Sequence, residues 1–158
     1  MIDLNDASTD EERLALRIFK AMEDGDLLEQ MQALCTEDFV WANSGLPTLH
    51  GQAAVRDLMS RGGFRNEIPI LETQTHFTAD VLHIASNGPV VFTERVDHHW
   101  AADGRDLMTP HIAGVIETTD GRISALRDVY DVACYTQPPT AADPDFTLEA
   151  HRARTSRT

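Results

Sequence analysis

Three charged residues, Arg95, Asp97 and Asp128, lie in segments that are otherwise typical of buried β-strands. Arg95 and Asp97 are two positions apart in "FTERVDHHW", and Asp128 lies in "ALRDVYDVACY". Residues two positions apart on a strand point to the same face. A lone buried carboxylate is costly, and Arg95 is the natural partner because its planar guanidinium can hold two carboxylates at once. The pattern therefore predicts a buried Asp–Arg–Asp cluster.

Two aspartates beside one guanidinium in a dry pocket do not titrate alike. One carboxyl can stay ionised while the other stays protonated near neutral pH, which provides a general base and a general acid. The same residues could instead form a buried ion-pair network that only fixes strand register. The pattern alone leaves both interpretations open.

The first part of the chain predicts three helices that would cover these strands. The first begins with a capping box at residues 8–12 and ends at Gly25. Shorter helical patterns follow at 26–35 and 51–63, and the turn-rich link 41–47 lies between them.

Alternating strand patterns follow the helices, separated by the turn signals "SNGP", "ADGR" and "TDGR". The expected strands are 72–84, 89–100, 107–118 and 122–135. Helices followed by an antiparallel meander predict an α+β fold, with the helices on one face of a curved sheet and room for an internal pocket. We expect one domain over 1–158, with its core at about 9–135 and a polar tail at 137–158.

The charge balance narrows the range of partners. The 158 residues include 26 acidic and 13 basic side chains, for a formal charge of −13. This charge disfavours nucleic acid and anionic membranes, and favours a small-molecule substrate or a second copy of the chain. The acidic N-terminus lacks the form of a signal peptide, so we expect a cytoplasmic protein.

No pattern in the sequence predicts a metal or a cofactor. Cys35 and Cys134 lack metal-ligand spacing and are expected to be free thiols. His98 and His99 are adjacent, so on a strand they face opposite ways and would not share an ion.

Several apolar and aromatic positions could form either core or the wall of a substrate pocket. We expect a pocket lined by Phe19, Met22, His99, Pro110, Ile112, Tyr130 and Tyr135. A second apolar row faces away from the helices and would be exposed in a monomer. We therefore expect a homodimer through the outward sheet face that carries Val96, His111, Ala113 and Val115.

The strings "TERVD" and "GVIETTDGRISALRDVYD" resemble the limonene-1,2-epoxide hydrolase family, over roughly residues 9–135. The resemblance implies a cone-shaped α+β fold, shared with ketosteroid isomerase and SnoaL-like polyketide cyclases. It also implies one-step, cofactor-free addition of water to an apolar epoxide, giving a vicinal diol.

By this resemblance, Asp97 is the acid that protonates the epoxide oxygen, Arg95 bridges both carboxylates, and Asp128 is the base that takes a proton from water. The family holds that water with a tyrosine and an asparagine. Asn43 stands in the asparagine place, whereas Trp41 replaces the tyrosine, and an indole N–H donates but does not accept. A further departure is His99, which takes a place that tends to be aliphatic in the family.

Epoxide hydrolysis is thus the leading functional hypothesis. A second hypothesis is a polyketide cyclase or isomerase on the same scaffold, in which an aspartate removes a proton α to a carbonyl. The third is a non-catalytic ligand-binding dimer with structural carboxylates.

Overall fold

In the computed structural model, which describes residues 1–137, 139, 149, 152 and 153, the first helix begins and ends where the sequence predicts. This helix is α1 (Asp10–Asp24). The Thr9 hydroxyl accepts a hydrogen bond from the Glu12 N–H at 3.1 Å, and the Glu12 carboxylate accepts one from the Ser8 N–H at 2.7 Å. Gly25 ends the helix in the left-handed conformation, with φ of 76°. The predicted capping box is confirmed.

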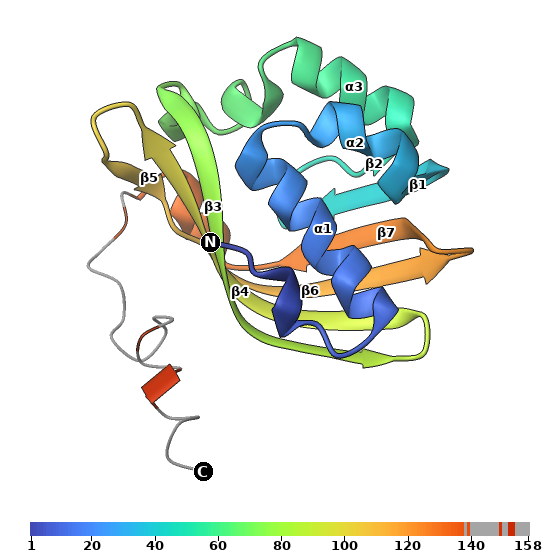
Figure 1. Cartoon of the computed structure of the whole chain (residues 1–158). Coiled ribbons are helices and arrows are strands. Elements are labelled where there is room, and N and C mark those ends of the chain that lie inside the picture. The colour runs from blue at the N-terminus through green and yellow to red at the C-terminus, as the bar shows by residue number, and fades with distance from the viewer. Residues whose placement is uncertain (138, 140–148, 150–151, 154–158) are drawn as a thin grey trace.

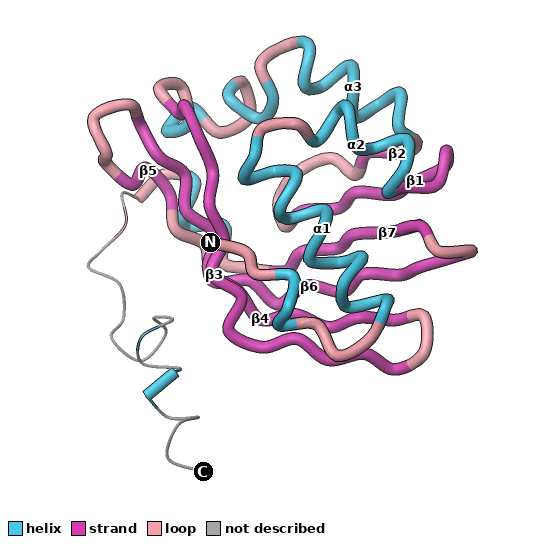
Figure 2. Tube along the Cα trace, in the orientation of Figure 1, coloured by secondary structure: helices cyan, strands magenta, loops and turns pink. Residues whose placement is uncertain are grey.

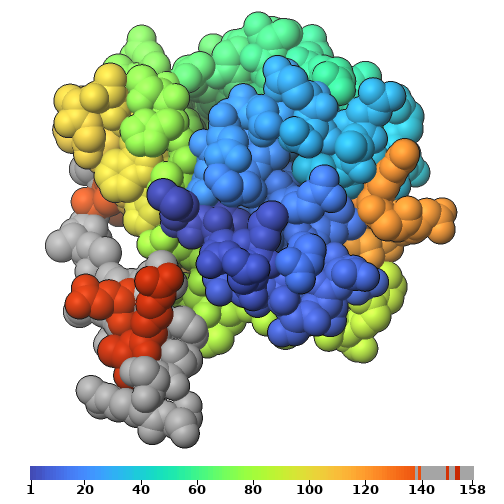
Figure 3. All heavy atoms as spheres, viewed as in Figure 1, coloured from blue at the N-terminus to red at the C-terminus, as the bar shows by residue number. Residues whose placement is uncertain are grey.

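The three helices pack together on one face of the sheet. Helix α1 buries an apolar face that includes Leu16, Ile18 and Phe19. The second and third helices are α2 (Leu27–Leu34) and α3 (Gln52–Ser60). Figure 1 shows α1 and α2 lying across the inner face of the curled sheet, with α3 beyond them. In Figure 3 the N-terminal helices, in blue, cover the face of the molecule toward the viewer.

The short helical elements are all of the 3-10 type. They are η1 (Leu4–Asp6), η2 (Gly63–Arg65), η3 (Pro69–Leu71) and η4 (Val132–Tyr135). Elements η2 and η3 connect α3 to the long edge strand that begins at Gln74. The element η4 follows the last strand.

The strands form one mixed sheet (Figure 2). They are β1 (Cys35–Asn43), β2 (Leu49–His50), β3 (Gln74–Asn87), β4 (Val90–Ala101), β5 (Asp106–Met108), β6 (His111–Thr119) and β7 (Arg122–Val129). The order is β2-β1-β7-β6-β4-β3, with β5 paired to β4. Strands β1 and β7 are parallel, and the remaining pairs are antiparallel. The predicted α+β class with a curved sheet is confirmed, and the three turn signals lie at the predicted β3–β4, β4–β5 and β6–β7 turns.

Strand β1 was not predicted from the sequence. The turn-rich link was expected at 41–47, whereas Trp41 and Asn43 lie in β1 and only the residues after them form the turn. One partner of β1 is β7, which is distant in sequence and parallel to it, and the other is the two-residue strand β2. The pairing with β7 has no hairpin turn to reveal it, and β2 is too short to show a strand pattern.

Two predicted strands are also shorter than expected. The segment 107–118 is interrupted at Thr109 and Pro110, because proline has no N–H to give to a ladder. The segment 122–135 stops being a strand at Val129. The Asp131 carboxylate then accepts a hydrogen bond from the Ala133 N–H at 2.9 Å, which caps η4. The predicted alternation of faces therefore does not extend to residues 130–135.

The outward sheet face carries most of the row that the sequence analysis assigned to it. His111 and Ala113 are exposed and Val115 is half-buried, whereas Val96 is only 8% exposed within one chain. Phe92 and Val129 add larger apolar side chains to this face and are 50% and 64% exposed. Within the described residues, the helices are too short or too polar to span a membrane. Most of the predicted tail lies outside the described residues.

Candidate active site

Arg95 lies at the centre of the candidate site, on β4 and on the sheet face that the helices cover. Its side chain is 2% exposed, and its guanidinium carbon lies 4.4 Å from the centroid of the Phe19 ring. The aromatic face supports the cation from the helix side. Because the arginine is enclosed, carboxylates must neutralise it within the protein.

Two aspartates share the Arg95 guanidinium. Nε and Nη2 donate to the two carboxylate oxygens of Asp97 at 2.8 and 3.2 Å. Nη1 and Nη2 donate to the two carboxylate oxygens of Asp128 at 2.9 and 2.6 Å. Asp97 and Asp128 are 6% and 5% exposed. The predicted cluster is therefore present as two bidentate pairs, and both carboxylates are oriented by the same planar group.

Strand register explains how residues on separate strands meet. Thr93 on β4 is opposite Gly114 on β6, and Gly114 is opposite Asp128 on β7. Gly114 has no side chain, so the Arg95 guanidinium reaches over β6 to the Asp128 carboxylate. A Cβ at Gly114 would lie 2.7 Å from Nη1 of Arg95 and 3.1 Å from Oδ1 of Asp128. This role of Gly114 was not predicted from the sequence, although a glycine within a strand often marks such a close approach.

Burial dominates the electrostatics of the cluster. Burial raises the pKa of Asp97 to about 6, against the opposing effect of the Arg95 charge. Burial by itself would lower the pKa of Arg95, but the two carboxylates raise it above its usual value. The guanidinium thus remains charged, and Asp97 can hold or release a proton near neutral pH.

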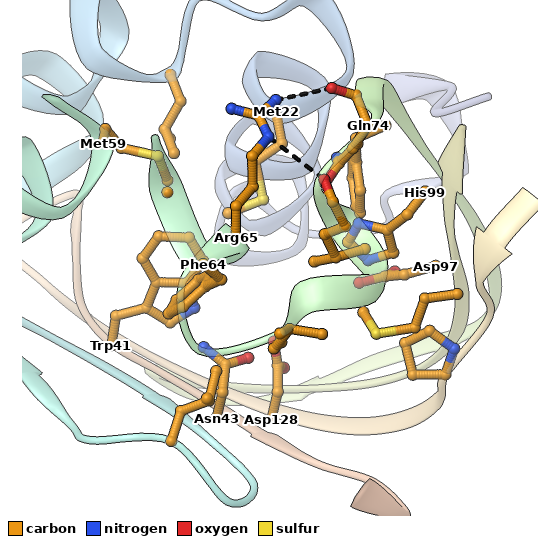
Figure 4. Close-up of a pocket in the computed structure, with 18 of the residues that line it drawn as sticks. Met22, Trp41, Asn43, Met59, Phe64, Arg65, Gln74, Asp97, His99 and Asp128 are labelled. Carbon is orange, nitrogen blue, oxygen red and sulfur yellow. Dashed lines mark hydrogen bonds between the residues drawn. The ribbon is translucent and has the colours of Figure 1, made fainter. Parts of the chain in front are cut away.

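A cavity of about 370 Å³ opens over Asp97 and Asp128, between the sheet and the helices. This volume is within the range of small-molecule sites. The wall is mainly apolar: Met22, Leu27, Leu28, Leu46, Met59, Phe64, Ile68, Leu71, Phe77, Met108, Pro110 and Ile112 contribute to it. The closing side comes from helices and from η2 and η3, as Figure 4 shows for Met22, Met59 and Phe64.

Asn43 and Trp41 reach the cavity from β1. Asn43 pairs in register with Asp128, and Figure 4 shows the two side chains next to each other. The Tyr130 hydroxyl lies 3.4 Å from Asn43 Oδ1. The indole N–H of Trp41 is buried and has no hydrogen-bond partner in the described chain. The Trp41 ring meets Phe64 edge-on at 5.6 Å.

The structure places five of the seven predicted pocket residues in the cavity wall, and it corrects two. Met22, His99, Pro110, Ile112 and Tyr130 line the cavity. Phe19 instead lies under the guanidinium, with none of its side chain exposed.

Tyr135 is the second correction, because it is on η4 rather than on a strand. Its hydroxyl lies 2.7 Å from the Tyr130 hydroxyl and donates to the Ser44 carbonyl at 2.5 Å. Tyr135 therefore supports Tyr130 from behind and does not line the cavity.

Other candidate groups stand apart from this cluster. The described residues contain no group of three or more histidine, cysteine or acidic side chains that could hold a metal ion. Cys35 is buried and Cys134 half-buried, and both are free, as predicted. His98 points away from His99 and contacts Asp106 at 2.6 Å.

Gly114→Ala should damage the site without altering any charged residue. The new Cβ would lie 2.5 Å from Thr93 Oγ1 as well as against Arg95. We expect a loss of about 1 to 3 kcal/mol in the free energy of unfolding, measured by urea denaturation. Ala102→Ser, in the exposed turn between β4 and β5, is the control and should change stability by less than about 0.5 kcal/mol. An unchanged stability in Gly114→Ala would contradict the close approach.

Comparisons with known proteins agree with the resemblance seen in the sequence. Residues 10–137 match the model of the limonene-1,2-epoxide hydrolase catalytic domain. A solved structure from M. tuberculosis is described as an epoxide hydrolase like limonene-1,2-epoxide hydrolase (LEH). It is 25% identical to this chain, with a TM-score of 0.63 and coverage of 80% of this chain and 81% of that one.

Two further solved structures share the fold at lower identity. An NTF2-like protein of unknown function from Burkholderia pseudomallei is 16% identical, with a TM-score of 0.63 and coverage of 82% and 99% of the two chains. A protein described as a SnoaL-like polyketide cyclase from Jannaschia sp. CCS1 is 14% identical, with a TM-score of 0.61 and coverage of 82% and 94%. Because the family model matches most of the chain, this protein belongs to the limonene-1,2-epoxide hydrolase family.

Proposed function

We propose that this protein is a cofactor-independent epoxide hydrolase that adds water to an apolar epoxide to give a vicinal diol. The observation that carries the proposal is the buried Asp97–Arg95–Asp128 cluster facing a largely apolar cavity. Epoxide opening needs a proton for the departing oxygen and a base for the attacking water. A pair of carboxylates with unequal proton affinity supplies both.

Asp97 acts as the general acid in this proposal. Its raised pKa of about 6 keeps a useful fraction of the carboxyl protonated near neutral pH. As the epoxide C–O bond breaks, the Asp97 proton passes to the oxygen and becomes the proton of one diol hydroxyl. Both Asp97 oxygens lie within hydrogen-bond distance of Arg95, which stabilises the carboxylate that remains.

Asp128 acts as the general base on the opposite side of Arg95. A water molecule between Asp128 and Asn43 would give one proton to Asp128 while its oxygen forms the new bond to carbon. Asn43 lines the cavity beside Asp128, and its amide N–H can donate to that oxygen. Trp41 lines the same side of the cavity, two positions before Asn43 on β1. Return of the proton from Asp128 to Asp97 restores the starting state.

Arg95 has an orienting role. It contacts both carboxylates and is enclosed by protein, so it fixes the separation of acid and base. The apolar wall excludes charged groups and favours a compact hydrocarbon body around the reacting ring. This combination of a polar floor and an apolar wall suits a neutral epoxide.

Asp128→Asn should lower kcat for diol formation from cyclohexene oxide or limonene oxide by at least about a hundredfold. The amide keeps the shape of the side chain but does not accept a proton from water. Diol formation is measured by gas chromatography, and the unfolding temperature of each variant is recorded alongside. Asp38→Asn, the same change at an exposed position on β1, is the control and should retain full activity.

The outcome of that assay separates the three functional hypotheses. Wild-type protein that yields no diol from a broad epoxide panel would exclude epoxide hydrolysis. Deuterium exchange next to the carbonyl of a ketone, without diol formation, would favour the cyclase or isomerase hypothesis. Ligand binding without either reaction would indicate a binding protein with structural carboxylates.

The pH profile tests the division of roles between the two aspartates. A general acid must be protonated in the reactive enzyme, so kcat/KM should fall as pH rises through the Asp97 pKa of about 6. The limiting slope is about tenfold per pH unit. Initial rates from pH 5 to 9, in steps of about 0.5 and corrected for uncatalysed hydrolysis, give this profile. A rate that rises with pH through this region would instead make Asp97 the base.

The outward sheet face supports a further proposal, that two copies of the chain associate there. Phe92 lies opposite Val115, and Ala113 lies opposite Val129. Ala113 and Val115 are two positions apart on β6, so the exposed apolar groups form a diagonal across three strands, with Glu94 and Arg127 beside it. Phe92→Asp should convert a dimer to a monomer in sedimentation velocity, because it buries a charge in the contact. Ala102→Asp, in the exposed β4–β5 turn, should leave the dimer intact. A wild-type chain that sediments as a monomer at all concentrations would refute the proposal.

A further inference from the structure

His99 is a polar side chain in the mainly apolar cavity wall, which Arg65 and Gln74 also line. It follows Asp97 by two positions on β4, so both side chains point to the cavity face. Figure 4 shows the two residues next to each other at one end of the cavity. Two other neighbours are apolar: Phe77 packs edge-on at 5.4 Å between ring centroids, and Met108 lies opposite on β5.

The hydrogen bonds around His99 define its tautomer. Nδ1 is buried and has no hydrogen-bond partner in the described part of the chain. The nearby Asp106 carboxylate is engaged by the His99 backbone N–H at 3.2 Å and by the His98 ring at 2.6 Å. A buried N–H without an acceptor is costly, so the imidazole proton belongs on Nε2 rather than on Nδ1.

The protonation state agrees with this assignment. Burial lowers the pKa of His99 to about 4, so the ring is neutral at neutral pH. A neutral ring with its proton on Nε2 is a hydrogen-bond donor. Within the described residues, no group accepts a hydrogen bond from Nε2 of His99, so a bound molecule can supply the acceptor.

We propose that His99 is a specificity-determining donor that selects epoxides carrying a hydrogen-bond acceptor oxygen, an ether or a carbonyl, close to the oxirane ring. This inference rests on the proposed epoxide hydrolysis and names its substrate class. When Asp97 holds the epoxide oxygen, the adjacent His99 meets the neighbouring part of the substrate. A pure hydrocarbon epoxide leaves the imidazole N–H unpaired, and buried polar groups left unpaired give strong discrimination.

The kinetic test compares cyclohexene oxide with its ring-ether analogues, in which oxygen replaces one methylene of the six-membered ring. These substrates have nearly the same shape. For each variant, kcat/KM for the ether is divided by kcat/KM for the hydrocarbon. This ratio should be at least about tenfold lower in His99→Leu than in wild type, and it should be closer to wild type in His99→Gln, which keeps a donor. Comparing ratios between variants removes the intrinsic reactivity of each epoxide.

Met108→Leu is the matched control, because it alters the same wall without changing its polarity. Its ratio should stay within about twofold of wild type. An unchanged ratio in His99→Leu, with both substrates still hydrolysed, would overturn the proposal and leave epoxide hydrolysis standing. An unchanged ratio would indicate that His99 has only a structural role.

A binding measurement makes the test independent of turnover. Nitrogen-15 NMR of wild-type protein labelled in histidine should show the His99 proton on Nε2 at pH 7. Adding tetrahydropyran, the ring ether without an epoxide, should shift that nitrogen resonance, whereas cyclohexane should not. A proton on Nδ1, or no shift with tetrahydropyran at saturation, would overturn the proposal even if the protein hydrolyses no epoxide.

Discussion

The buried guanidinium of Arg95 is the constraint on which the rest of the site depends. An enclosed cation must be neutralised, and here two carboxylates from different strands contact it. Its planar shape fixes both carboxylates in one arrangement, which a lysine ammonium would not do. Asp97 and Asp128 are therefore oriented by the same group, and the burial that makes the cluster costly also raises the pKa of Asp97 into the useful range.

The sheet is built to permit this contact. The side chain of Arg95 must pass over β6 to reach Asp128 on β7, and the only residue type that leaves room at the crossing is glycine. Gly114 thus contributes to the site because it has no side chain, which leaves room for the Arg95 guanidinium. Phe19 supports the cation from α1, so helix, central strands and the cluster are coupled in one packed unit.

The cavity combines a charged floor with an apolar wall, and the exceptions in that wall are informative. Trp41 and His99 each carry a buried nitrogen without a hydrogen-bond partner in the described chain. Protein interiors rarely leave such groups unsatisfied, and those that exist often mark places where water or a ligand binds. Trp41 lies on β1 and His99 on β4, and strands β7 and β6 lie between these two strands in the sheet.

The sequence alone determined the elements whose signals are local. The capping box and Gly25 placed α1, the Gly-containing turns placed the hairpins, and the spacing of Arg95 and Asp97 put both on one face. A buried charge needs a partner, so the contact with Asp128 could also be inferred.

Long-range pairing was decided only in the tertiary structure. The parallel pairing of β1 with β7 places Asn43 beside Asp128, and no hairpin turn in the sequence indicates this pairing. The end of β7 at Val129 moved Tyr135 out of the cavity wall and behind Tyr130. Phe19 is equally apolar whether it lines a cavity or supports a cation, and Gly114 becomes meaningful only once its neighbours are known. Sequence periodicity gives the face of a residue, whereas its contacts depend on which distant strand folds against it.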